Sequence, residues 1–141
     1  MKKSINDIMK KEHLKMEELV NKFKNSDDET TKDSQYLFNQ LSWVIKEQFF
    51  MEEKLIFSVY NLDVDINGNS ELIDDHEEIL SILNKIENKK LKNINEDLEK
   101  LANVLKTHSK IEEDIFYEKL DNLLSDEEKL EMITRAKEFL K

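Results

Sequence analysis

Apolar residues recur along most of this chain at intervals of three and four, the spacing that places them on one face of an α-helix. Polar stretches at residues 25–34, 61–70 and 88–93 interrupt the pattern and divide it into four long segments. No segment alternates with the period of a β-strand. The pattern therefore predicts an all-α protein whose four long amphipathic helices form an up-down-up-down four-helix bundle.

Capping residues mark the beginnings of two predicted helices. Ser4 with Asp7 resembles a capping box, and Ser125 with Glu128 forms one, which opens a short C-terminal fifth helix. The fourth segment has the most regular apolar face, which runs through Ile94, Leu98, Leu101, Leu105 and Ile115. A chain of 141 residues fits one such domain, over residues 1–141.

Charge argues against two classes of partner. The 22 basic and 32 acidic residues give a formal net charge of −10, and no basic cluster offsets it. Binding to phosphate backbones or to anionic lipid surfaces needs clustered Lys and Arg. We therefore expect neither nucleic-acid nor membrane binding.

Targeting and redox signals are sparse. No apolar run reaches the roughly 18–20 residues of a membrane span, and the N-terminal sequence MKKSINDIMKKEHLK lacks the apolar core of a signal peptide. These observations favour a cytoplasmic location. The chain has no Cys, so disulfides, thiolate metal ligands and thiol catalysis are excluded.

Each of the three histidines continues an apolar helical face. Glu112 follows His108 by four residues and stays on the same face, because positions i and i+4 are neighbours on a helix. The second segment presents Gln48 and Glu52 in the same way. The predicted inward set is His13, Gln48, Glu52, His76, His108 and Glu112.

A bound metal explains this set better than core packing does. One histidine on an apolar face is usually a hydrogen-bonded core residue, but two buried carboxylates are costly through desolvation and mutual repulsion. Both costs disappear when the carboxylates share a cation with imidazoles. Such ligands without thiolate suit iron, manganese or zinc, and two Glu on opposite helices can bridge two metals. The Glu-x-x-His motif of ferritin-like centres is absent, because Lys10, Ile73 and Leu105 stand three residues before the histidines.

In these residues the chain resembles the hemerythrin-like family, specifically its bacterial HHE cation-binding branch. That pattern has a His in helix one, His-x-x-x-Glu in helix two, a His in helix three and His-x-x-x-Glu in helix four. The matching residues are His13, Gln48 with Glu52, His76, and His108 with Glu112. The phrase EE-x-x-x-F/Y also follows in both Glu-bearing helices, through Phe57 and Tyr117.

The resemblance implies a four-helix bundle with a non-heme di-iron centre that reacts with dioxygen, peroxide or nitric oxide. It implies that Glu52 and Glu112 bridge the two irons, that His76 and His108 bind one iron, and that His13 binds the other. An unknown protein partner would be needed for signalling, because the chain ends soon after the bundle.

The chain departs from the family pattern at two positions. Leu80 stands where oxygen-carrying hemerythrins have a second His in helix three, which favours a sensor, an iron handler or a protective role over an oxygen store. Gln48 stands where a His would share an iron with His13, so the second iron site is in doubt. Glu17, one turn after His13, is the best-placed replacement ligand. An iron with fewer fixed ligands favours weak peroxide or catalase-like chemistry.

The polar stretch before the third segment contains a second candidate motif, a calcium-binding loop. Residues 63–74, DVDINGNSELID, match the order of an EF-hand calcium loop, from Asp63 to Asp74. Position 12 is Asp where Glu is usual, and no second copy exists, so a helix–helix turn is the preferred interpretation.

Aromatic residues gather on the second segment, at Trp43, Phe49, Phe50 and Phe57. Packing in the core and along the flanks of the bundle accounts for most of them, and a helix–helix dimer contact through Phe49 and Phe50 is the alternative.

Three functions follow from these residues. The first is a di-iron protein that senses or consumes oxygen, peroxide or nitric oxide. The second is a metal-storage or metal-delivery module, and the third is a degenerate, metal-free helical interaction domain.

Overall fold

Long helices account for almost all of the described chain. The computed structural model describes residues 4–25, 32–57 and 69–139, and this part of the chain contains no strand. The elements are α1 (Ile5–Lys24), α2 (Lys32–Met51) with the π-helical turn η1 (Glu52–Phe57), α3 (Asn69–Asn88), α4 (Asn95–Ile111) with the π-helical turn η2 (Glu112–Phe116), α5 (Tyr117–Leu123) and α6 (Asp126–Phe139).

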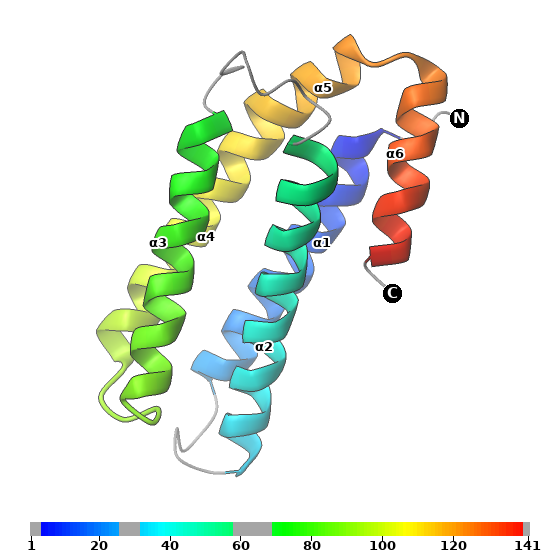
Figure 1. The fold of residues 1–141 in the computed structure, drawn as a ribbon. Helices are drawn as coiled ribbons and strands as arrows, with labels where there is room; N and C mark the ends of the chain where they lie inside the picture. Colours follow the sequence, from blue (N-terminus) through cyan, green and yellow to red (C-terminus); the bar gives the residue numbers. More distant parts are fainter. Residues whose placement is uncertain (1–3, 26–31, 58–68, 140–141) are drawn as a thin grey trace.

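These helices form the predicted bundle. The helix α1 packs against α2 and α4, and α3 packs mainly against α4 (Figure 1). Helix four is built from α4, η2 and α5 in direct succession, and α6 folds back against α1 and α2. The predicted all-α fold with a short C-terminal fifth helix is confirmed.

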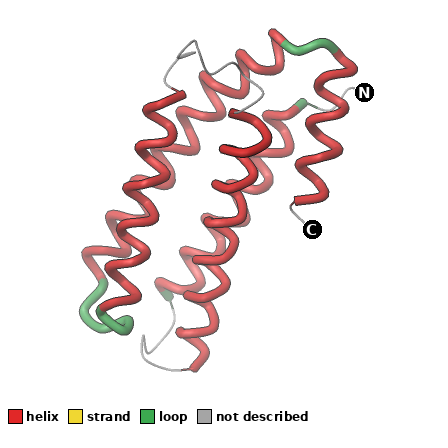
Figure 2. Tube along the Cα trace, viewed as in Figure 1, coloured by secondary structure: helices red, strands yellow, loops and turns green. Residues whose placement is uncertain are grey.

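The caps that the sequence indicated are formed. The Ser4 hydroxyl accepts a hydrogen bond from the backbone N–H of Asp7 at 2.9 Å. In the loop before α6 (Figure 2), Ser125 N–H donates to Glu128 Oε1 at 2.9 Å and Glu128 N–H donates to Ser125 Oγ at 3.2 Å. The Asp121 carboxylate also accepts from the backbone of Ile5 at 2.9 Å, so α5 satisfies the N-terminus of α1.

Two apolar clusters fill the bundle, one on each side of a layer of buried polar side chains. This polar layer consists of His13, Gln48, Glu52, His76, His108 and Glu112. The larger cluster includes Met16, Ile45, Ile79 and Leu105 and extends towards the α3–α4 junction. The smaller cluster joins the other end of the four long helices to α6, and consists of Ile5, Met9, Met51, Leu72, Phe116, Tyr117, Leu120, Met132, Ile133 and Ala136. Each large apolar side chain buried in this way contributes about 1.5–3 kcal/mol, which offsets the cost of burying polar groups between the clusters.

The α3–α4 junction at 88–93 is short and left-handed in part. Lys90, Leu91 and Asn93 have φ between 53° and 62° although none is Gly. The Leu91 side chain is buried against the larger cluster, and Lys89 pairs with Asp97 at 2.8 Å, so packing and charge hold the unfavourable backbone in place.

Two sequence-based expectations were wrong in detail. The predicted polar connection, residues 25–34, is too long at its end, because α2 already begins at Lys32. Ile115 does not continue the inner face, because it is 44% exposed while Phe116 is buried.

The calcium-loop alternative at 63–74 lies largely outside the described residues, and its last residues already belong to α3. No helix within the described ranges is long and apolar enough to cross a membrane.

Candidate metal centre

Two π-helical turns place the two central carboxylates. Glu52 is the first residue of η1 and Glu112 the first of η2, so the same local deviation occurs in both Glu-bearing helices. A π-helical turn contains an extra residue and rotates the following side chains relative to an α-helix. In helix four this rotation brings Tyr117 into the core beside Phe116, while Ile115 points outward. Such turns occur frequently at functional sites.

Four residues from three helices converge on one position. Glu52, His76, His108 and Glu112 each offer one ligand atom, and these atoms all lie within 4.8 Å of one another. All four side chains are at most 1% exposed. His76 Nε2 lies 3.5 Å from Glu52 Oε1, and His108 Nε2 lies 3.3 Å from Glu112 Oε1. This group has the residue types and the spacing of a metal site.

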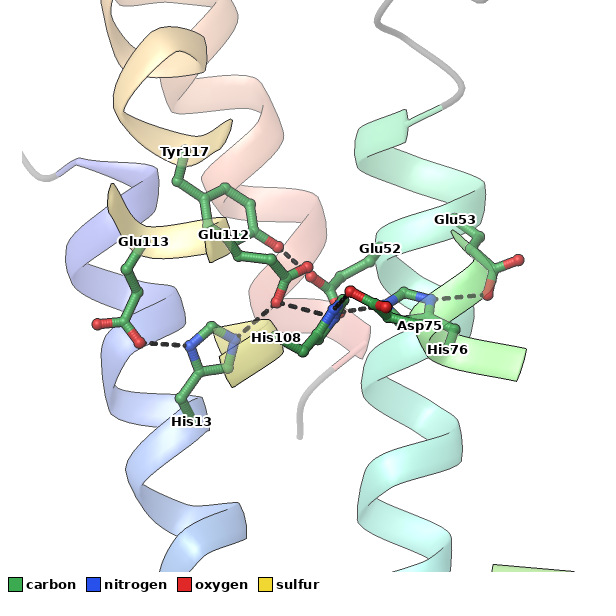
Figure 3. Close-up of polar contacts among 9 residues, drawn as sticks. All are labelled: His13, Glu52, Glu53, Asp75, His76, His108, Glu112, Glu113 and Tyr117. Atoms are coloured by element: carbon green, nitrogen blue, oxygen red, sulfur yellow. Dashed lines mark hydrogen bonds and ion pairs between the residues drawn. The ribbon is translucent and has the colours of Figure 1, made fainter. Parts of the chain in front are cut away.

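His13 approaches the same layer from α1. Its Nε2 atom lies 3.1 Å from Glu112 Oε1, the oxygen that also faces His108 (Figure 3). His13 is not part of the group of four, but Glu112 connects it to that group. Glu112 Oε1 therefore faces two imidazoles, His13 on α1 and His108 on α4.

Outer carboxylates hold the far nitrogen of every histidine. His13 Nδ1 lies 2.8 Å from Glu113 Oε2, His76 Nδ1 lies 3.0 Å from Glu53 Oε2, and His108 Nδ1 lies 3.2 Å from Asp75 Oδ2. A carboxylate accepts from Nδ1–H, which in neutral imidazole leaves the Nε2 lone pair for a metal. Carboxylate–histidine pairs of this kind orient metal ligands and increase their basicity.

Two aromatic residues complete the layer. The Tyr117 hydroxyl is buried and donates a hydrogen bond to Glu52 Oε2. The Phe49 ring stacks on His76, with ring centroids 3.8 Å apart and planes 7° from parallel. Tyr117 thereby orients one carboxylate and Phe49 orients one imidazole.

Proton affinities in the layer reflect its packed charges. Burial alone would lower the pKa of His13 and of His108, but contact with Glu112 and its negative charge raise both to about 9. Burial and the neighbouring Glu112 raise the pKa of Glu52 to about 7. Burial would also raise the pKa of Glu112, but the surrounding imidazoles hold it well below its usual value. Without a metal, the positively charged imidazoles of His13 and His108 balance the negative charge of Glu112. A bound metal ion would take over this role.

The layer leaves buried polar atoms without normal hydrogen bonds. Within the described chain these include Glu52 Oε1, both oxygens of Glu112 and both amide atoms of Gln48. Such atoms are costly when buried, and in native proteins they usually mark an ion or water. The donor set and these atoms fit a bound metal.

The two additional candidate ligands differ in position. Gln48 is completely buried, one turn before Glu52. Glu17 is exposed, and it lines a cavity of about 190 Å³ that His13 also lines. The cavity lies between α1 and α4, and Met16, Val20 and Leu105 form its apolar part. Gln48 is therefore buried one turn from Glu52, whereas Glu17 is exposed at the cavity beside His13.

Comparison with known families identifies the class of protein that this fold and layer define. The model of the hemerythrin HHE cation-binding domain matches residues 4–136. The chain therefore belongs to the hemerythrin HHE cation-binding family. Neither the curated proteins nor the solved structures contain a significant match.

Sequence reasoning missed the residues that support the histidines. Glu53, Glu113 and Asp75 each directly follow or precede a predicted ligand, so the acidic doublets Glu52-Glu53 and Glu112-Glu113 were a visible signal. Tyr117 entered only through the EE-x-x-x-F/Y phrase, and Phe49, which is buried, only as a core or dimer-contact residue. A regular helical wheel does not direct Tyr117 towards Glu52, because the π-helical turn η2 brings it there.

Proposed function

We propose that this protein holds a dinuclear non-heme iron centre and uses it to bind dioxygen, peroxide or nitric oxide. The observation that carries the proposal is one buried layer of two carboxylates and three imidazoles, in which every imidazole has its Nδ1 atom on an outer carboxylate. Membership of a cation-binding family supports it.

The first metal position is formed by Glu52, His76, His108 and Glu112. The second uses His13 and the shared carboxylates, and Gln48 supplies a neutral amide oxygen in place of an imidazole. Buried imidazole and carboxylate without thiolate suit iron, manganese or zinc, and the family resemblance selects iron. Bound iron would supply open coordination positions and redox chemistry for small oxygen and nitrogen ligands.

A sensing or protective role fits this layer better than storage or delivery. The ligands are almost completely buried, so releasing a metal to an acceptor would require the bundle to open. Leu80 packs against the larger apolar cluster, at the position where oxygen carriers have a further histidine. Small ligands would instead reach the His13 position through the cavity between α1 and α4.

Metal analysis of protein purified without oxygen tests the proposal. We expect about two irons per chain and a visible charge-transfer band that changes when azide or peroxide is added. One labile metal per chain would favour storage or delivery, and absence of metal after reconstitution would favour the metal-free interaction domain. If the cavity is the route of entry, Ala102→Phe slows azide binding and leaves the final spectrum unchanged.

A further inference from the structure

Three aromatic side chains lie exposed in a line along α2. Tyr36 is 66% exposed, Trp43 is 58% exposed and Phe50 is 52% exposed. They are seven residues apart, and residues at this spacing differ by only about 20° around a helix. They therefore form one aromatic stripe, which we call the α2 stripe.

The surface around the α2 stripe is unusually poor in charge. Charged residues make up 38% of the chain, but residues 34–51 contain only Lys46 and Glu47. The exposed polar residues on this helix include Gln35, Asn39 and Gln40, of which Gln35 Nε2 donates to Asn39 Oδ1 at 2.9 Å. Depletion of charge together with enrichment of aromatic residues is the composition of an interface core.

We propose that the α2 stripe is the contact surface of a homodimer, in which α2 packs antiparallel against α2 of a second copy. A two-fold axis at Trp43 places the two Trp43 rings together and places Tyr36 opposite the partner subunit's Phe50. The stripe is self-complementary about its own centre, as a two-fold interface must be.

The charges select the antiparallel arrangement. With the axis at Trp43, Lys46 lies opposite the partner subunit's Gln40, and Glu47 lies opposite the partner subunit's Asn39. A parallel pair would instead place Lys46 against Lys46 and Glu47 against Glu47. Amides can hydrogen-bond to either charge, whereas like charges in contact are destabilising.

The overall charge favours a second copy over other occupants. Lys46 and Glu47 cancel, so the stripe is neutral on a chain of net charge −10, and two copies can approach there without local repulsion. The stripe has no basic cluster for a lipid surface or a nucleic acid. The buried residues of α2, including Phe49, lie on a different face, so the contact leaves the metal layer unaltered.

Sedimentation equilibrium and the fluorescence of Trp43, the single tryptophan, test the proposal. We expect a mass of about twice 16.9 kDa and a blue-shifted emission that moves to the red on dilution. Trp43→Glu should yield a monomer with unchanged helix content and metal binding. Leu130→Glu, which changes a side chain on α6 that is 66% exposed, is the matched control and should remain dimeric. A wild-type monomer at about 100 µM, with red-shifted emission, would overturn the proposal.

Cysteine cross-linking tests the register independently, because the chain has no native Cys. A mixture of Tyr36→Cys and Phe50→Cys proteins should form the mixed disulfide in preference to either symmetric one. Preferential symmetric cross-links would contradict the antiparallel arrangement. No cross-linking above that of Leu130→Cys would contradict the interface itself, and a Tyr36→Ser, Phe50→Ser double variant that stays dimeric would do the same. The mass, fluorescence and cross-linking measurements do not depend on whether the bundle binds iron.

Discussion

The two sides of the metal layer are built from unequal parts. On one side, His76 and His108 lie with their ring centroids 4.7 Å apart, and each has its Nδ1 atom on an outer carboxylate. On the other side, His13 is the single imidazole, supported by Glu113. Gln48, one turn before Glu52, is completely buried, and neither of its amide atoms has a hydrogen bond to the described residues.

This difference concerns ligand strength more than position. An amide oxygen is neutral and weakly basic, so under the proposed function a metal beside Gln48 would be bound less tightly than one between two imidazoles. Glu112 is common to both sides, through contacts with His13 and His108. The comparison therefore predicts a hierarchy in which loss of Glu112 affects both metals and loss of His13 affects one.

The largest effect is expected from Glu112→Gln. The substitution keeps the size of the side chain but removes the charge that both positions share, so metal content should fall from about two per chain to nearly zero. Elemental analysis after reconstitution measures it. Glu118→Gln changes an exposed residue of α5 and should keep full metal content. Retention of both metals by Glu112→Gln would contradict the shared role.

Removing one imidazole from each side separates the two positions. His13→Ala should lose the second metal and any catalase-like turnover, while one tightly bound metal remains. His108→Ala should instead weaken metal binding at the first position, because His108 belongs to the group of four. Titration with iron(II) under nitrogen gives both stoichiometries. Equal losses in the two variants would show that the sides are equivalent.

Gln48→His would make the two sides more alike. An imidazole at this buried position supplies a stronger ligand, so we expect the second metal to bind at least about tenfold more tightly, equivalent to about 1.4 kcal/mol. Competition with a chelator measures the change. Gln40→His, on the exposed surface of α2, is the control. An unchanged affinity would indicate that Gln48 does not face the second metal.

The outer carboxylates should have smaller effects, one on each side. Glu113→Gln removes the acceptor at His13 Nδ1, and Glu53→Gln removes the acceptor at His76 Nδ1. Changes of this kind reduce metal affinity by about 10–100-fold. We expect Glu113→Gln to release the weaker metal first and Glu53→Gln to lower the affinity of the stronger one. Chelator competition in which both variants release the same metal would contradict this assignment.

The smallest effect concerns pH and the stability of the metal-free protein. The pKa values of His13 and His108 are about 9 in the folded chain, against 6.5 for ordinary histidine, so the folded state binds protons more strongly than the unfolded state. The resulting stabilisation is complete below about pH 6.5 and is lost as the pH rises through 9. The melting temperature of metal-free protein should therefore fall by about 5 °C or more over this range. A constant melting temperature would contradict the prediction.

Much of the fold was predictable because helical patterning is local. The spacing of apolar residues and the capping box of Ser125 with Glu128 act over a few neighbours, and apart from Ile115 both predictions are confirmed. Helix ends were less predictable: Lys32 to Ser34 are polar but already helical, and Ser34 is completely buried, which local composition does not indicate.

By itself, the sequence determined the bundle and the candidate ligands. The type of each residue and its position in the helical repeat decide which side chains share an inner face. Only the tertiary structure decided how these ligands are held. The contacts of Glu113 with His13 and of Asp75 with His108 join different helices, and the π-helical turn η2 moves Tyr117 inward and Ile115 outward. These features depend on the balance of packing across the whole bundle, which no single helical pattern contains.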